Sequence, residues 1–146
     1  MIKLSTGMRE SLAITGSLKA TLDGGLIRIY SGSVPANADA ALGGAVLLCE
    51  ISVGGDGTPV SFEATAPLGV LVKSVSENWT GNNLASGTPT FFRYVLDGDA
   101  GDSSATAVRF QGTAGALGSD MFIADLPLVS GEPLSFSLFR LTIPEQ

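Results

Sequence analysis

The sequence contains no histidine, and its only cysteine is Cys49. Without an imidazole, Ser-His-Asp and Cys-His catalysis in their usual forms are excluded, and so are zinc sites built on histidine. A single cysteine cannot form an internal disulfide bond, and the apolar run AVLLCEISV around it predicts a buried structural thiol. Both observations argue against a redox or nucleophilic enzyme.

Charge is also scarce. Charged residues make up 15% of the chain, against roughly 25% in ordinary soluble domains. The formal net charge is −6, and the eight basic residues are scattered along the chain. Because no basic stripe is present to neutralise phosphates, nucleic-acid binding is disfavoured. The apolar composition fits either a surface packed against partner proteins or a count raised by small Ala and Gly residues.

Motifs for catalysis and membrane insertion are missing too. The chain has no GxSxG elbow, no GxxxxGK[ST] phosphate loop and no GxGxxG after a strand. No stretch approaches 18 apolar residues, and the N-terminal segment lacks the apolar core of a signal peptide. We therefore expect no enzymatic activity, no cofactor, no bound metal and no membrane contact.

Residues 1–24 have a helical pattern. Ser5 or Thr6 can cap a helix start, Gly16 is expected to divide the helix into two, and Asp23-Gly24-Gly25 ends it. Four apolar side chains fall near one face: Met8, Leu12, Leu18 and Leu22. A short amphipathic segment outside the β pattern must bury such a stripe. We therefore predict an N-terminal helical arm whose stripe binds a partner subunit.

From Leu26 onward the pattern is extended, in short runs separated by Gly, Pro, Asn and Asp. The runs are LIRIY (26–30), VLLCEISV (46–53), VSFEA (60–64), GVLVKSV (69–75), NWTGNNL (78–84), TFFRYVL (90–96), AVRFQGTA (107–114), MFIADL (121–126) and LSFSLFRLTI (134–143). This spacing predicts a single mainly β domain over residues 25–146, an antiparallel β-sandwich or jelly roll. In the last run the alternation slips by one residue at Leu138-Phe139, which predicts a β-bulge there.

The stretch DGDAGD, residues 97–102, holds three carboxylates in six residues. Read as an EF-hand loop from Asp97, it has Gly101 at position 5 and Val108 at position 12, where calcium needs oxygen ligands. Its flanking strand patterns instead predict a long hairpin with Asp97, Asp99 and Asp102 solvated at the tip. A weak divalent-ion site in this loop stays open as the alternative.

Two further groups have a chemical and a structural interpretation. The candidate glycosidase acids are Glu50, Glu63 and Glu77. Acids on the outward face of a strand, however, ordinarily serve solubility. The candidate sugar-binding platform is Trp79 with Phe91, Phe92 and Tyr94. Aromatics at strand spacing usually fill the core, so the sequence favours the structural interpretation for both groups.

A family resemblance spans most of the chain. GSLKATLDGG leads into LIRIYSGSVPANADAALG, and VLLCEISV, TPTFFRYVLDGD, VRFQGTAG and a last strand after LVSGEPLSF follow. This pattern resembles small virion structural proteins of tailed bacteriophages and prophages. A sandwich or jelly-roll domain with a short N-terminal arm is, among these, similar to the head decoration (cement) proteins.

The resemblance implies a non-enzymatic virion protein, assembled in the cytoplasm of the bacterial host. It would bind the major capsid protein, stabilise the head and form a homo-oligomer, because an oligomer multiplies weak contacts. The other expectations are a neck, collar or tail component, a carbohydrate-binding module for host attachment, and a glycoside-active enzyme.

Overall fold

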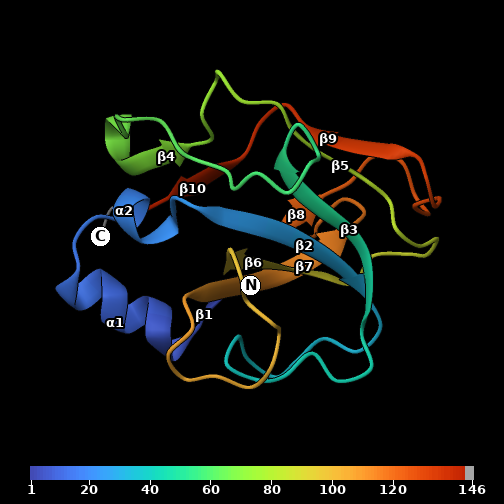
Figure 1. Ribbon diagram of the computed structural model, residues 1–146, viewed down its shortest axis with the longest axis horizontal. Coiled ribbons are helices and arrows are strands. Elements are labelled where there is room, and N and C mark those ends of the chain that lie inside the picture. Colours follow the sequence, from blue (N-terminus) through green and yellow to red (C-terminus); the bar gives the residue numbers. More distant parts are fainter. Residues whose placement is uncertain (144–146) are drawn as a thin grey trace.

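The computed structural model describes residues 1–143, and its elements are labelled in Figure 1. The helices are α1 (Thr6–Ile14), α2 (Leu18–Leu22) and the single 3-10 turn η1 (Pro67–Gly69). The strands are β1 (Lys3–Leu4), β2 (Gly25–Ser31), β3 (Val46–Val53), β4 (Val70–Val72), β5 (Trp79–Asn82), β6 (Phe91–Leu96), β7 (Arg109–Gly115), β8 (Met121–Phe122), β9 (Pro133–Phe136) and β10 (Arg140–Thr142).

One large, mostly antiparallel sheet organises the fold. Its strands run in the order β1-β7-β6-β2-β3-β5-β9, and β8 adds to β7 in parallel. The strands β10 and β4 form a separate two-stranded sheet. The prediction of a mainly β chain with short N-terminal helices is confirmed, whereas the β-sandwich or jelly-roll arrangement stays a prediction.

The N-terminal helices begin and end where the sequence indicates. The hydroxyl of Ser5 accepts a hydrogen bond from the amide of Met8 at 3.0 Å, which caps α1. Ser17 caps α2 in the same way, through the amide of Ala20. Between them Gly16 has φ of 133°, a conformation that glycine adopts at no steric cost. The predicted division into two short helices is confirmed.

Two strand predictions need correction, and the first concerns residues 60–64. This run forms only isolated bridges, from Val60 to Gly25 and from Phe62 to Lys73. Side chains take two of the amides that a regular ladder would use. The amide of Ser61 donates to Glu77 at 3.0 Å, and that of Phe62 donates to Asp23 at 3.0 Å.

The second correction concerns the last run, 134–143. It is not one strand with a bulge, because β9 ends at Phe136 and pairs with β5, whereas β10 starts at Arg140 and pairs with β4. The one-residue slip at Leu138-Phe139 therefore marks the place where the chain leaves one sheet for the other. A register shift of the bulge type lies instead between β2 and β3, where Leu48 of β3 is the extra residue opposite the step from Ile29 to Tyr30.

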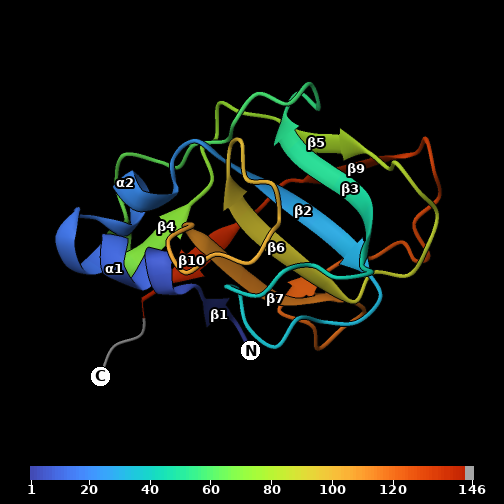
Figure 2. The same ribbon diagram turned by 60° about the horizontal axis from the view of Figure 1, so that its bottom comes forward.

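The apolar core lies on one face of the main sheet. Ile27, Ile29, Phe92, Tyr94 and Phe110 contribute side chains from β2, β6 and β7. Segments outside the main sheet cover them, and Figure 2 shows α1 and α2 close to β4 and β10 at one end of that sheet. Each of α1, α2, β4 and β10 contributes at least one apolar residue that belongs to this core or packs against it.

Candidate interaction surface

The predicted partner-binding stripe packs against its own chain. Met8 and Leu22 are only 2% and 0% exposed and belong to the core, while Leu12 and Leu18 are partly buried against it. A role for these four residues in binding a partner stays a prediction. The argument that this stripe needs a partner subunit to bury it is wrong, because residues of the same chain already cover it.

Close contacts tie residues 1–24 to the hairpin of β6 and β7. A Cβ atom on Gly7 would lie 2.2 Å from the carbonyl oxygen of Thr106, so only glycine allows this approach. The hydroxyl of Ser5 donates to the carbonyl of Ala107 at 2.7 Å. At the other end of the segment, Tyr94 donates its hydroxyl to the carbonyl of Leu22 at 2.5 Å.

The DGDAGD loop joins β6 to β7 as a hairpin connection, but its three acids are not alike. Asp97 and Asp102 are exposed. The side chain of Asp99 is only 6% exposed and forms a two-pronged ion pair with Arg109, at 2.6 and 2.9 Å. The prediction that Asp99 is solvated is therefore wrong. Its carboxylate fixes the loop to the sheet rather than facing water.

A second buried cation lies on the same face of the sheet. Arg93 is fully buried and donates to the side-chain oxygen of Gln111 at 2.7 Å and to the carbonyl of Ala40 at 3.0 Å. Gln111 in turn donates to the carbonyl of Pro35 at 2.8 Å. Burial, and next the positive charge of Arg109, lowers the pKa of Arg93. The loops around residues 33–45 and 97–108 thus cover a polar layer whose groups bind one another.

The three candidate glycosidase acids each have a structural partner. Glu50 pairs with Arg28 at 2.7 Å, and Glu63 accepts from the amide of Val75 at 2.7 Å. Glu77 accepts from the indole of Trp79 at 2.7 Å and from Ser61. Burial raises the pKa of Glu77, but these hydrogen bonds outweigh it and hold the pKa below its ordinary value.

The aromatic group fills the interior. Trp79 is fully buried, with Phe62 edge-on at 5.4 Å and Phe139 at 5.5 Å between ring centroids. Phe91, Phe92 and Tyr94 are buried as well. Trp79 therefore presents no ring face to a sugar. The prediction that these aromatics fill the core is confirmed, and an exposed platform built on them is ruled out.

Two general findings concern the described residues 1–143. No three His, Cys, Asp or Glu side chains gather there in a way that could hold a metal ion. No helix there combines the length and the apolar character that a membrane crossing requires.

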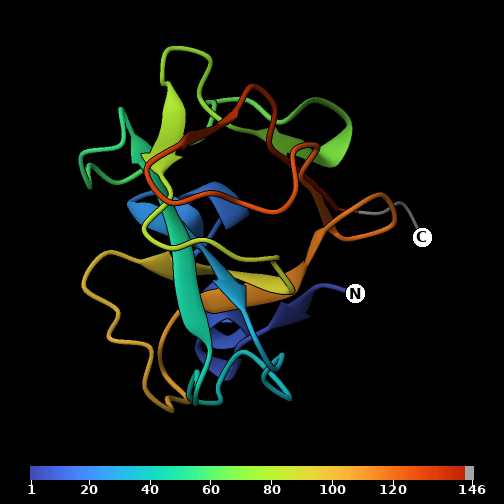
Figure 3. The ribbon, with the colours of Figure 1, turned by 90° about the vertical axis from the view of Figure 1, so that its right-hand side faces the viewer.

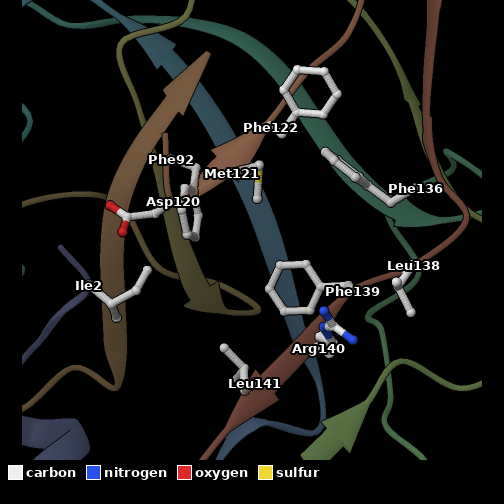
Figure 4. A pocket seen from close by; sticks show the side chains of 10 residues that line it. All are labelled: Ile2, Phe92, Asp120, Met121, Phe122, Phe136, Leu138, Phe139, Arg140 and Leu141. Atoms are coloured by element: carbon white, nitrogen blue, oxygen red, sulfur yellow. The ribbon is translucent and has the colours of Figure 1, made fainter. Parts of the chain in front are cut away.

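An apolar groove of about 400 Å³ lies beside β8 and the segment that joins β9 to β10. Figure 4 shows Phe122 and Phe136 at one end, Ile2 and Leu141 at the other, and the ring of Phe139 between them. Phe122 and Leu138 stay 56% and 57% exposed. Large apolar side chains left this open mark a surface suited to a partner.

The groove continues into a shallower hollow. This hollow lies between residues 122–125 and 133–138, and it shares Phe122, Phe136 and Leu138 with the groove. In Figure 3 the orange segment around β8 and the red segment after β9 lie side by side. The two hollows together form one strip, which we call the apolar strip, with Phe122, Phe136 and Leu138 at its centre.

A separate apolar patch surrounds η1. Leu68 is 90% exposed in a left-handed conformation, with φ of 54°. Such a conformation is uncommon outside glycine. Ile143 is exposed nearby, and its carbonyl oxygen lies 3.2 Å from the position a Cβ atom would take on Gly69. We call Leu68 and Ile143 the η1 patch.

The residues of the apolar strip did not emerge as site candidates from the sequence. The run LSFSLFRLTI did place Phe136 and Leu138 on one face. Such alternation indicates a core face, because nothing local shows that β9 is the last strand of its sheet. β9 lies at the end of the sheet because it pairs with β5, which comes more than fifty residues earlier in the chain.

Comparison with known proteins adds no relative. No protein-family description, no curated protein and no solved structure matches this chain.

Proposed function

We propose that this protein is a non-enzymatic structural protein of a tailed-bacteriophage virion, a capsid decoration (cement) protein that binds the major capsid protein and stabilises the head. The observation that carries the proposal is the presence of two separate exposed apolar surfaces on one β framework, the apolar strip and the η1 patch. A protein that joins neighbouring subunits needs more than one contact surface, and exposed apolar patches are typical of such contacts.

The internal structure supports the same proposal. The buried ion pair of Asp99 with Arg109 and the contacts of Arg93 hold the loops to the sheet. A cement protein works by holding its contact side chains in place, and a framework with satisfied polar groups does this. Closure of the sheet into a sandwich or jelly roll, and assembly into a homo-oligomer, belong to this proposal.

The test is to purify intact particles from a lysate of the bacterium that carries the gene and to count this chain against the major capsid protein by quantitative mass spectrometry. We expect a fixed ratio with many copies per head. Substitution Leu68→Asp should lower that ratio several-fold, because it puts a charge into the η1 patch. Leu117→Asp is the matched control, since Leu117 is equally exposed but lies outside both surfaces.

Each result decides between the expectations. A few copies per particle would favour a neck, collar or tail position over head decoration. Complete absence of the chain from intact particles would contradict a virion role altogether. Binding of glycans by the free protein, with no particle association, would favour the carbohydrate-binding module.

A further inference from the structure

Two charged side chains of opposite sign line the apolar strip. Arg140 lines the groove and Asp125 lines the adjoining hollow, and the shared apolar centre lies between them. Both residues are exposed. Within residues 1–143 neither side chain has an ion-pair partner. Asp120 also lines the groove, but its carboxylate already pairs with the N-terminal amine at 2.8 Å. The strip thus has a cation in the groove and a carboxylate in the adjoining hollow, neither with an ion-pair partner among residues 1–143, and it has Phe122, Phe136 and Leu138 where the two hollows meet.

We propose that the apolar strip is the contact surface of a two-fold symmetric homodimer. In such a contact the same surface is used by both copies, so residue i of one meets residue j of the other twice. A two-fold axis through the apolar centre would stack Leu138 and Phe122 against their counterparts. It would also bring Arg140 of each subunit to Asp125 of the partner subunit. The dimer would therefore hold two reciprocal ion pairs around an apolar core.

The charge pattern selects a second copy over other occupants. A single carboxylate on an apolar ligand would satisfy Arg140 but would leave Asp125 unmatched. An inverted copy of the strip matches both charges and the apolar centre at once. Each chain has a net charge of −6, so two copies repel overall. Local complementary pairs are then what orients them. This inference specifies the surface and the symmetry of the homo-oligomer in the proposed function, but the observations that carry it do not depend on a virion role.

The test is charge reversal and its repair, measured by sedimentation equilibrium on the whole chain. The single variants Arg140→Glu and Asp125→Lys should each weaken dimerisation at least about tenfold in Kd, because each turns two attractive pairs into repulsive ones. In the double variant the two charges have exchanged signs, so each Glu at position 140 would meet a Lys at position 125 of the partner subunit. Its Kd should return to within about threefold of the parent Kd, because only reciprocal pairing lets the second change repair the first.

Matched controls separate this effect from net charge and from misfolding. Arg9→Glu and Asp97→Lys make the same charge changes on exposed side chains outside the strip, and they should leave the Kd unchanged. Leu138→Asp should abolish the dimer through the apolar centre. Circular dichroism melts of every variant establish that it is folded before its mass is interpreted.

Three outcomes would overturn the proposal: a parent protein that stays monomeric up to about millimolar concentration, a double variant no better than the singles, or a Leu138→Asp variant that still dimerises. A monomer that still binds particles, and loses them on Leu138→Asp, would assign the strip to another virion protein. Dimer loss without loss of particles would leave the proposed function intact.

Discussion

Two regions of this molecule each contain an arginine beside large side chains. They differ in whether a carboxylate of the same chain pairs with the guanidinium group. Under the loops, Arg109 has the carboxylate of Asp99 within its own chain. In the apolar strip, Arg140 has no ion-pair partner among residues 1–143, and Phe122 is more than half exposed. The first region holds the fold together, whereas the second is suited to association. Changes in the first should therefore cost stability, and changes in the second should cost binding.

The largest effect is expected from Asp99→Asn. It leaves Arg109 buried without a counter-charge, and removing one partner of a buried pair costs about 3–5 kcal/mol. Urea denaturation followed by circular dichroism measures the loss. Asp97→Asn, in the same loop but exposed, should change the free energy of unfolding by less than about 0.5 kcal/mol. Equal losses of unfolding free energy for the two variants would contradict the conclusion that Asp99 is a buried ion-pair partner and Asp97 is solvated.

A smaller loss is expected from Gly7→Ala. The added methyl group would meet the carbonyl oxygen of Thr106 at 2.2 Å, so α1 must shift away from the hairpin, at a cost of about 1–3 kcal/mol. Gly44→Ala is the control, because a Cβ atom at Gly44 has open space around it. Thermal melts compare the two. If Gly7→Ala melts like the parent, α1 is not held against the hairpin as described.

Glu77→Gln should cost about 1.5–2 kcal/mol near neutral pH, the lower part of the usual range for hydrogen bonds to a charged group. The pKa of Glu77 in the folded state lies below its ordinary value of 4.5. Its contribution is therefore complete above pH 4.5 and is lost as the pH falls through the folded-state pKa. Denaturation curves from pH 7 to pH 3 should show a shallower acid decline for Glu77→Gln. A decline identical to the parent's would contradict this role.

The smallest effect on stability is expected from Leu138→Asp, because this side chain is exposed in the single chain. The free energy of unfolding, measured in dilute solution, should change by no more than about 0.5 kcal/mol. Association should nevertheless be lost. Leu84→Asp is the control, since Leu84 is similarly exposed outside the strip. A large destabilisation by Leu138→Asp would mean that Leu138 serves the core.

Local patterns in the sequence predicted much of the fold. The alternation in LIRIY and TFFRYVL located β2 and β6, which pair at the centre of the sheet. Ser5 and Gly16 predicted the start of α1 and the break before α2, because capping and left-handed glycine depend on neighbouring residues alone. The burial of Trp79 also followed from its place in a strand.

Contacts between distant segments could not be predicted. Asp99 reads as a turn residue, and only the pairing of β6 with β7 brings Arg109 to it. Phe136 and Leu138 read as core residues, and only the position of β9 at the end of the sheet leaves Leu138 exposed. Both cases depend on strand order, which local periodicity does not contain.

The central claim is that the apolar strip, and not the loop-covered polar layer, is the surface through which two copies of this protein associate. Hydroxyl-radical footprinting at increasing protein concentration tests it most directly, because it reports the exposure of single side chains. The account predicts that labelling of Phe122 and Leu138 falls several-fold as the protein associates, while labelling of Leu68 and Leu84 stays constant. Labelling of Phe122 and Leu138 that does not change between dilute protein and associated protein would contradict it.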